Sequence, residues 1–270
     1  KEAKTMSRIK GKFKELKGQG REAFIVFITA GYPNLEITYR LIIEFAKAGV
    51  DIIELGVPFS DPMADGPLIQ ESSHAALEKK VNLNHILGLI FRVRRKTQVP
   101  ICLMTYYNPV FCFGEKRFVE AASRCGVDAV IVPDLPPEEA SSLIRLSRKH
   151  DLDVVCFISP TTSVERIRKI CAVSRGFIYY VSLTGVTGPR QKLPADLVNK
   201  LKVIKRYART PVCVGFGVST HEQVKKIRKV ADGVIVGSAI VKKIKDNIGK
   251  PDLVRRVSSF VRQLMRRDGS

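Results

Sequence analysis

The chain alternates short runs of apolar residues with longer stretches in which apolar and polar residues recur at helical spacing. The short runs are rich in Val, Ile, Phe and Tyr, and most lack the every-second-residue alternation of a half-buried strand. Continuous apolar runs of this kind are typical of parallel strands that are buried on both faces. We therefore predict eight strands, at residues 23–30, 51–55, 100–106, 128–134, 153–159, 176–182, 211–217 and 232–238.

The longer stretches carry signals for the ends of helices. Residues 34–49 begin at Asn34, a residue type that caps helices, and end at Gly49. The stretch 137–150 has its acids in the first turn and its bases in the last, as the helix dipole favours. Similar patterns predict helices at residues 163–174 and 219–231, before the first strand (about 4–17) and after the last (about 238–266).

Eight strand–helix units follow one another without a linker or a low-complexity segment. In a chain of 270 residues, this order predicts an α/β fold, a (β/α)8 TIM barrel with an extra N-terminal helix. We expect residues 1–270 to form a single domain. The alternative is an open doubly wound sheet, which more often carries a GxGxxG motif after its first strand, and that motif is missing here.

Acidic residues gather at the end of the second predicted strand, in ELGVPFSDPMADGP (residues 54–67). Glu54 ends an apolar strand, and Asp65 lies in a loop, stiffened by proline and glycine, that can fold back over the barrel mouth. Two carboxyl groups in different environments can take different protonation roles, and barrel chemistry sits at the carboxyl ends of strands. We therefore predict Glu54 and Asp65 as catalytic residues, and interpret Asp61 as a turn residue and Asp51 as a stabilising residue at the opposite end.

Glycine-rich segments follow the last three predicted strands. They are SLTGVTGPR after the sixth, GFG at the end of the seventh, and Gly237 with Ser238 after the eighth. Glycine lets backbone N–H groups approach an anion, and the N-terminus of a helix favours negative charge. These loops predict a phosphate site; the alternative is that the glycines only permit tight turns.

The chain has 46 Lys and Arg against 26 Asp and Glu, a formal net charge of +20. We interpret the basic residues as solvated outer helix faces that also favour phosphorylated substrates or an acidic partner surface. They lack the motifs and interleaved aromatics of nucleic-acid binding, so we expect no nucleic-acid partner. Six cysteines without a CxxC pair and four scattered histidines predict neither a metal site nor a disulfide framework. The longest uncharged run, residues 99–114, is too short to span a membrane, and we expect a cytoplasmic protein.

Six longer motifs follow one another along the chain: ELGVPFSDPMADGPLIQ, YYNPVF, VPDLPPEE, GVTGPR, GFGVST and GSAIVK. In this order, over about residues 13–260, they resemble the α subunit family of tryptophan synthase. That family is a (β/α)8 barrel that cleaves indole-3-glycerol phosphate to indole and glyceraldehyde 3-phosphate in tryptophan biosynthesis. The resemblance implies that Glu54 is the acid–base for the glycerol hydroxyl and indole C3. It implies that Asp65 holds the indole N–H and stabilises the positive charge on the ring.

The resemblance also implies which residues bind the substrate, and that no metal or cofactor is needed. The residues that match the indole pocket, each of which can equally be an ordinary core residue, are Phe27, Tyr106, Ile131, Phe157 and Tyr179. The residues that match the phosphate site and its closing loop are Thr187, Gly188, Gly217, Gly237 and Ser238.

Members of the family normally pair with a pyridoxal-phosphate β subunit that receives indole through a tunnel, which implies an α2β2 complex. Apolar residues of two rim loops suit such an interface, although we expect Phe111 to pack inward. The alternative is a stand-alone indole-3-glycerol-phosphate lyase that releases free indole, as in plants, where the location is a plastid. A remote alternative is a basic scaffold or nucleic-acid-binding barrel without activity.

Overall fold

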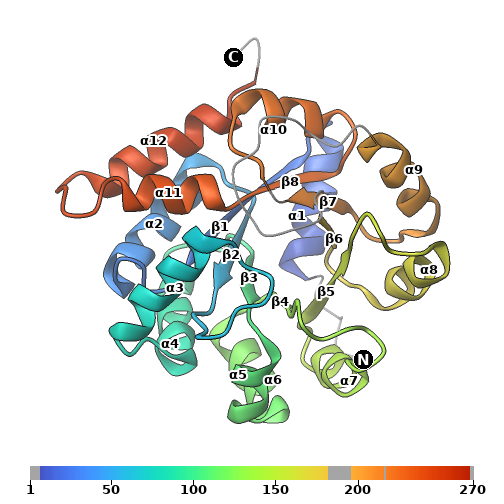
Figure 1. The fold of residues 1–270 in the computed structure, drawn as a ribbon, viewed down its shortest axis with the longest axis horizontal. Helices are drawn as coiled ribbons and strands as arrows, with labels where there is room; N and C mark the ends of the chain where they lie inside the picture. The colour runs from blue at the N-terminus through green and yellow to red at the C-terminus, as the bar shows by residue number, and fades with distance from the viewer. Residues whose placement is uncertain (1–6, 182–195, 216, 268–270) are drawn as a thin grey trace.

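The computed structural model describes residues 7–181, 196–215 and 217–267, and these form a closed barrel. Its eight parallel strands pair in chain order, and β1 pairs with both β2 and β8. Figure 1 shows the helices arranged around these central strands. The predicted (β/α)8 fold is confirmed, and the open sheet is excluded. The strands are β1 (Ala23–Thr29), β2 (Ile52–Gly56), β3 (Ile101–Met104), β4 (Ala129–Ile131), β5 (Asp153–Ile158), β6 (Ile178–Val181), β7 (Val212–Gly215) and β8 (Gly233–Val236).

The helices follow the predicted alternation, and some connections hold two. One helix precedes the first strand, as predicted. In the described part of the chain the helices are α1 (Arg8–Gly18), α2 (Leu35–Ala48), α3 (Pro67–Glu78), α4 (Leu83–Arg94), α5 (Tyr107–Phe113), α6 (Glu115–Cys125), α7 (Ser141–Lys149), α8 (Val164–Val173), α9 (Leu197–Tyr207), α10 (His221–Arg228), α11 (Ser238–Lys245) and α12 (Leu253–Met265).

Burial explains why the strand sequences show no polar alternation. Every residue of β1 and β2 is buried, because one face of each strand fills the barrel and the other packs against helices. The helix ends also follow local chemistry. The side chain of Asn34 accepts the N–H of Ile37 at the start of α2, and Gly49 ends that helix with a φ of 88°.

Several predicted elements are shorter in the structure than in the sequence pattern, and two of these differences have a local cause. The segment at about 238–266, predicted to be helical, is divided into α11 and α12, because Gly249 has a φ of 83° and Pro251 has no N–H to continue a helix. The strand predicted at 128–134 ends at Ile131. Pro133 lies two residues further on and cannot donate a hydrogen bond to a neighbouring strand.

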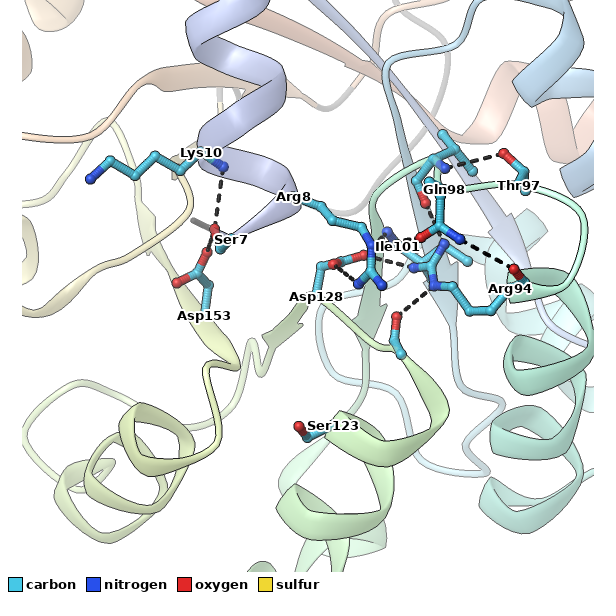
Figure 2. A network of polar contacts seen from close by, with 12 residues as sticks. Ser7, Arg8, Lys10, Arg94, Thr97, Gln98, Ile101, Ser123, Asp128 and Asp153 are labelled. Carbon is cyan, nitrogen blue, oxygen red and sulfur yellow. Dashed lines mark hydrogen bonds and ion pairs between the residues drawn. The ribbon is translucent and has the colours of Figure 1, made fainter. Parts of the chain in front are cut away.

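Helix α1 covers the amino end of the barrel and is held there by polar contacts (Figure 2). Ser7 donates a hydrogen bond of 2.9 Å to Asp153 at the start of β5. Arg8 lies 2.8 Å from the carboxylate of Asp128, and Arg94 approaches the other oxygen of the same group at 2.7 Å. Only 3% of the Asp128 side chain is exposed. Through its pair with Arg8, this buried carboxylate anchors α1 to the amino end of the barrel.

Three aspartates at this end repeat one contact, in which a carboxylate just before one strand accepts an N–H from the start of the preceding strand. The pairs are Asp51 with Phe24, Asp128 with Ile101 and Asp232 with Val212, each at 2.8 Å. The predicted place of Asp51 at the amino end of the barrel is confirmed by its contact with Phe24. Among the described residues, no helix has the length and apolar character needed to cross a membrane.

Candidate active site

Glu54 projects from β2 into the barrel, beside Phe27 of β1 and Cys102 of β3 in the strand register. It is fully buried, and neither carboxyl oxygen has a hydrogen-bond partner among the described residues. A carboxylate in such a place loses the water that stabilises its charge. Burial, assisted by the nearby charge of Asp65, raises the pKa of Glu54 to about 8.

Asp65 comes from the loop between β2 and α3, which brings it next to Glu54. It is 8% exposed. The Tyr106 hydroxyl donates to one carboxylate oxygen of Asp65 at 3.0 Å and accepts the N–H of Ala64 at the same distance. The Gln70 side chain donates to the Asp65 carbonyl at 2.8 Å. Burial raises the pKa of Asp65, and the hydrogen bond from Tyr106 opposes this rise.

Both carboxyl groups face one small cavity at the carboxyl ends of the strands. Its lining residues are Phe27, Glu54, Asp65, Ile69, Met104, Tyr179, Gly217, Ile235, Gly237 and Ser238. The cavity holds about 40 Å³, roughly the share of one water molecule. A bicyclic ring therefore enters only if the surrounding side chains move.

The aromatic residues predicted for the ring pocket lie in and beside this cavity. Phe27 and Tyr179 line it, while Tyr106 contacts Asp65. Ile131 is fully buried in β4 and Phe157 packs its ring 4.8 Å from that of Tyr179, and neither residue lines the cavity.

Three lining residues were not predicted from the sequence: Ile69, Met104 and Ile235. Met104 carried a usable signal, because it ends β3 and strand ends form the mouth of a barrel. Ile69 lies on α3, and no sequence pattern marks the face of that helix that turns toward the cavity.

Another part of the cavity lining has the features of an anion site. Gly237 precedes α11, whose first residue Ser238 lines the cavity. The first N–H groups of a helix have no partner within it and carry partial positive charge. A Cβ on Gly237 would lie 3.3 Å from Phe27, and Gly217 has a φ of 76°, so both places suit glycine. Thr187 and Gly188 lie outside the described residues.

The prediction that Phe111 packs inward is wrong, because 67% of this residue is exposed. On the short helix α5, Val110 takes the buried position, and the next residue is rotated by about 100° toward solvent. Phe113 instead packs against Phe118, with ring centroids 6.4 Å apart.

Fold and cavity together define a class of protein. It is a (β/α)8-barrel enzyme with two buried carboxyl groups and a glycine-bounded helix N-terminus around one cavity at the carboxyl ends of the strands. This arrangement combines acid–base groups with an anion site and suits a phosphorylated substrate.

Comparison with known proteins identifies the family. The model of the tryptophan synthase alpha chain family matches residues 13–267, so the chain belongs to this family. It is 49% identical to the tryptophan synthase alpha chain of Geobacter sulfurreducens over 96% of this chain and 98% of that one. The alpha subunit structure from Legionella pneumophila str. Paris has a TM-score of 0.89 and 36% identity, with 97% and 99% of the two chains covered. A tryptophan synthase complex from Pyrococcus furiosus has a TM-score of 0.84 and 35% identity, with 91% and 98% covered.

Family membership defines the reaction. The chain is a lyase of tryptophan biosynthesis that cleaves indole-3-glycerol phosphate, and the resemblance read from its motifs is confirmed. Family membership therefore speaks against the alternative of a basic scaffold barrel without activity.

Proposed function

We propose that Glu54 and Asp65 carry out this cleavage by general acid–base catalysis, with the proton on Glu54 and the negative charge on Asp65. The observation that carries the proposal is the state of Glu54. It is fully buried beside Asp65 in the cavity, has no described hydrogen-bond partner, and has a pKa raised to about 8. At neutral pH most of this carboxyl group therefore holds its proton.

The two carboxyl groups differ because only one of them has a donor. The Tyr106 hydroxyl stabilises the Asp65 carboxylate, whereas the described surroundings of Glu54 offer no hydrogen bond to an anion. Neighbouring carboxyl groups in unequal environments divide acid and base roles in this way.

The proposed reaction has two proton transfers. Glu54 donates its proton to C3 of the indole ring, which gives an indolenine cation, and Asp65 accepts a hydrogen bond from the ring N–H and stabilises that charge. The Glu54 carboxylate then takes the proton of the glycerol hydroxyl next to the ring. The C–C bond breaks, its electron pair restores the aromatic indole, and the oxygen becomes the aldehyde carbonyl of glyceraldehyde 3-phosphate.

The substrate phosphate is proposed to bind at the N-terminus of α11, near Gly217, Gly237 and Ser238. The support is that all three residues line the cavity of the two carboxyl groups, so one substrate can reach both. Roles for Thr187 and Gly188 stay predictions from the resemblance.

The test is the rate of indole release by Glu54→Gln. This change keeps the size of the side chain and removes the transferable proton, and we expect a loss of about 10²–10⁴-fold. Asp61→Asn is a matched control in the same loop, because Asp61 is exposed and does not line the cavity. Similar rates for the Glu54 variant and the control would overturn the assignment.

We further propose that the chain acts with a β subunit in an α2β2 complex that docks over the cavity. Phe111 and Met63 are 67% and 82% exposed near the carboxyl end of the barrel, and such apolar side chains favour an interface. The Pyrococcus furiosus relative is itself a tryptophan synthase complex. A cytoplasmic location stays a prediction, in keeping with six free thiols.

The partner is tested by sedimentation with a cognate β subunit. Phe111→Asp is expected to weaken the complex at least about tenfold, because it places a charge in an apolar contact. Phe91→Asp is the control, since Phe91 is 51% exposed on α4. Full indole release by the isolated chain, with no complex at micromolar concentration, would favour the stand-alone lyase.

A further inference from the structure

Basic residues recur at the amino end of the barrel, opposite the catalytic cavity. Besides α1, seven of the described helices lead directly into a strand and therefore end at this face. All of these seven helices except α8 carry Lys or Arg in the last turn. From the sequence we expected basic residues on outer helix faces, and the structure places these ones at the helix ends of one face of the barrel. These residues are Lys47, Arg92, Arg94, Arg124, Arg148, Lys149, Lys205, Arg206, Lys225, Lys226 and Arg228.

A groove of about 690 Å³ opens at this face, between α1 and the amino ends of β5, β6 and β7. Small-molecule sites commonly have about 300–1,000 Å³, so the groove is of ligand size. Cations exceed acids in its lining. The charged residues are Lys10, Lys14, Lys17, Arg175 and Arg209 against Asp151 and Asp153.

One wall of the groove is a row of lysines on α1. Lys10, Lys14 and Lys17 are spaced four and three residues apart, so they lie along one face of the helix, roughly 6 Å and 4.5 Å apart along its axis. None of the three forms an ion pair with a described acid, whereas Lys12 of the same helix pairs with Glu15 at 2.8 Å. Figure 2 shows the Lys10 side chain extended away from the contact between Ser7 and Asp153.

The opposite wall adds a cation and a hydroxyl. Arg209 has no ion pair with a described acid and is exposed at the groove. The hydroxyl oxygen of Thr210 is buried and has no described hydrogen-bond partner, a state that a ligand oxygen would relieve. Asp153 is already engaged by Ser7 at 2.9 Å and by Arg175 at 3.6 Å, so its charge is partly neutralised.

We propose that this groove binds a compact anion that carries two or more phosphate groups. Cations on both walls of the groove suit an anion with several charges better than one with a single charge. The excess of cations over acids in the groove lining raises the local concentration of such an anion. Because the groove and the catalytic cavity lie at opposite ends of the barrel, both can be occupied together.

The test is calorimetric titration of the full chain with inorganic tripolyphosphate. We expect one saturable site, and we expect Lys14→Gln with Arg209→Gln to weaken it by at least about tenfold, since each change removes a charged contact to phosphate. Thr210→Val, which keeps the shape of the side chain, is expected to weaken it by a smaller factor. Circular dichroism melts establish that each variant is folded.

The matched control removes the same charge elsewhere. Lys116 and Lys169 are exposed on α6 and α8 and do not line the groove, so Lys116→Gln with Lys169→Gln should change the affinity less than about twofold. Indole release should be equal in both double variants, which separates this proposal from the catalytic one. The proposal is overturned if binding does not saturate at millimolar tripolyphosphate or if both double variants weaken it equally. It is also overturned if the substrate displaces all bound tripolyphosphate, because the anion then binds in the catalytic cavity and not in the groove. A short RNA that binds more tightly and is not displaced by tripolyphosphate would overturn it too, in favour of a nucleic-acid surface.

Discussion

The hydroxyl of Tyr106 is a sensitive place to test the active-site account. It donates to the Asp65 carboxylate and accepts the N–H of Ala64, both at 3.0 Å. The hydroxyl therefore stabilises the negative charge of Asp65 and also fixes the loop that carries this residue. Tyr106→Phe removes one oxygen and keeps the ring, which stacks on Phe59 with centroids 5.1 Å apart. A hydrogen bond to a charged group contributes about 1.5–3 kcal/mol, which corresponds to a loss of roughly ten- to a hundredfold in kcat/KM.

The same change has a defined sign in the pH profile. The Tyr106 hydrogen bond lowers the pKa of Asp65, so its removal raises that pKa, and the acidic limb of kcat/KM for indole release should move to higher pH. Tyr107→Phe is the control, because the Tyr107 hydroxyl donates at 3.0 Å to Glu115, outside the cavity. If the two variants have equal kcat/KM and the same acidic limb, Tyr106 does not act through Asp65 and the reasoning fails.

Two further predictions concern the barrel itself. Asp128→Asn breaks the buried pairing that joins α1 to the barrel and should lower the free energy of unfolding by about 3 kcal/mol. Asp252→Asn loses two arginine partners at the surface and should have a much smaller effect, and equal urea midpoints for the two variants would contradict this. Gly215→Ala places a Cβ 2.6 Å from the Tyr179 hydroxyl, so that ring must shift, and we expect about 1–3 kcal/mol of lost stability together with a higher KM for the substrate. An unchanged KM and melting temperature would show that the site tolerates the added carbon.

The fold was predictable because each strand is a local apolar run and each helix has local end signals. Buried β1 and β2 read as continuous apolar sequence, and Asn34 and Gly49 mark the ends of α2 in the sequence as they do in the structure. The division between α11 and α12 was missed although Gly249 and Pro251 signal it locally. That residues 1–270 form one domain stays a prediction.

The site was predictable only where a residue type is unusual for its place. A carboxyl group at the end of an apolar strand identified Glu54, and a stiff loop with Asp65 followed it. The inward turn of Met104 and the outward turn of Phe111 depend on strand register and helix rotation, which apolar character alone does not specify. The contact between Arg8 and Asp128 joins residues 120 positions apart, and no local pattern encodes it.

The central claim is that Glu54 keeps its proton at neutral pH, and a carbon NMR titration of the glutamate carboxyl groups tests it most directly. The Glu54 signal is assigned by its loss in Glu54→Gln. Since burial favours the neutral form, the folded chain binds this proton more tightly than the unfolded chain, and we expect a titration midpoint at about pH 8. A midpoint near the ordinary glutamate value of about 4.3 would show that Glu54 is already ionised at neutral pH and would contradict its role as the proton donor.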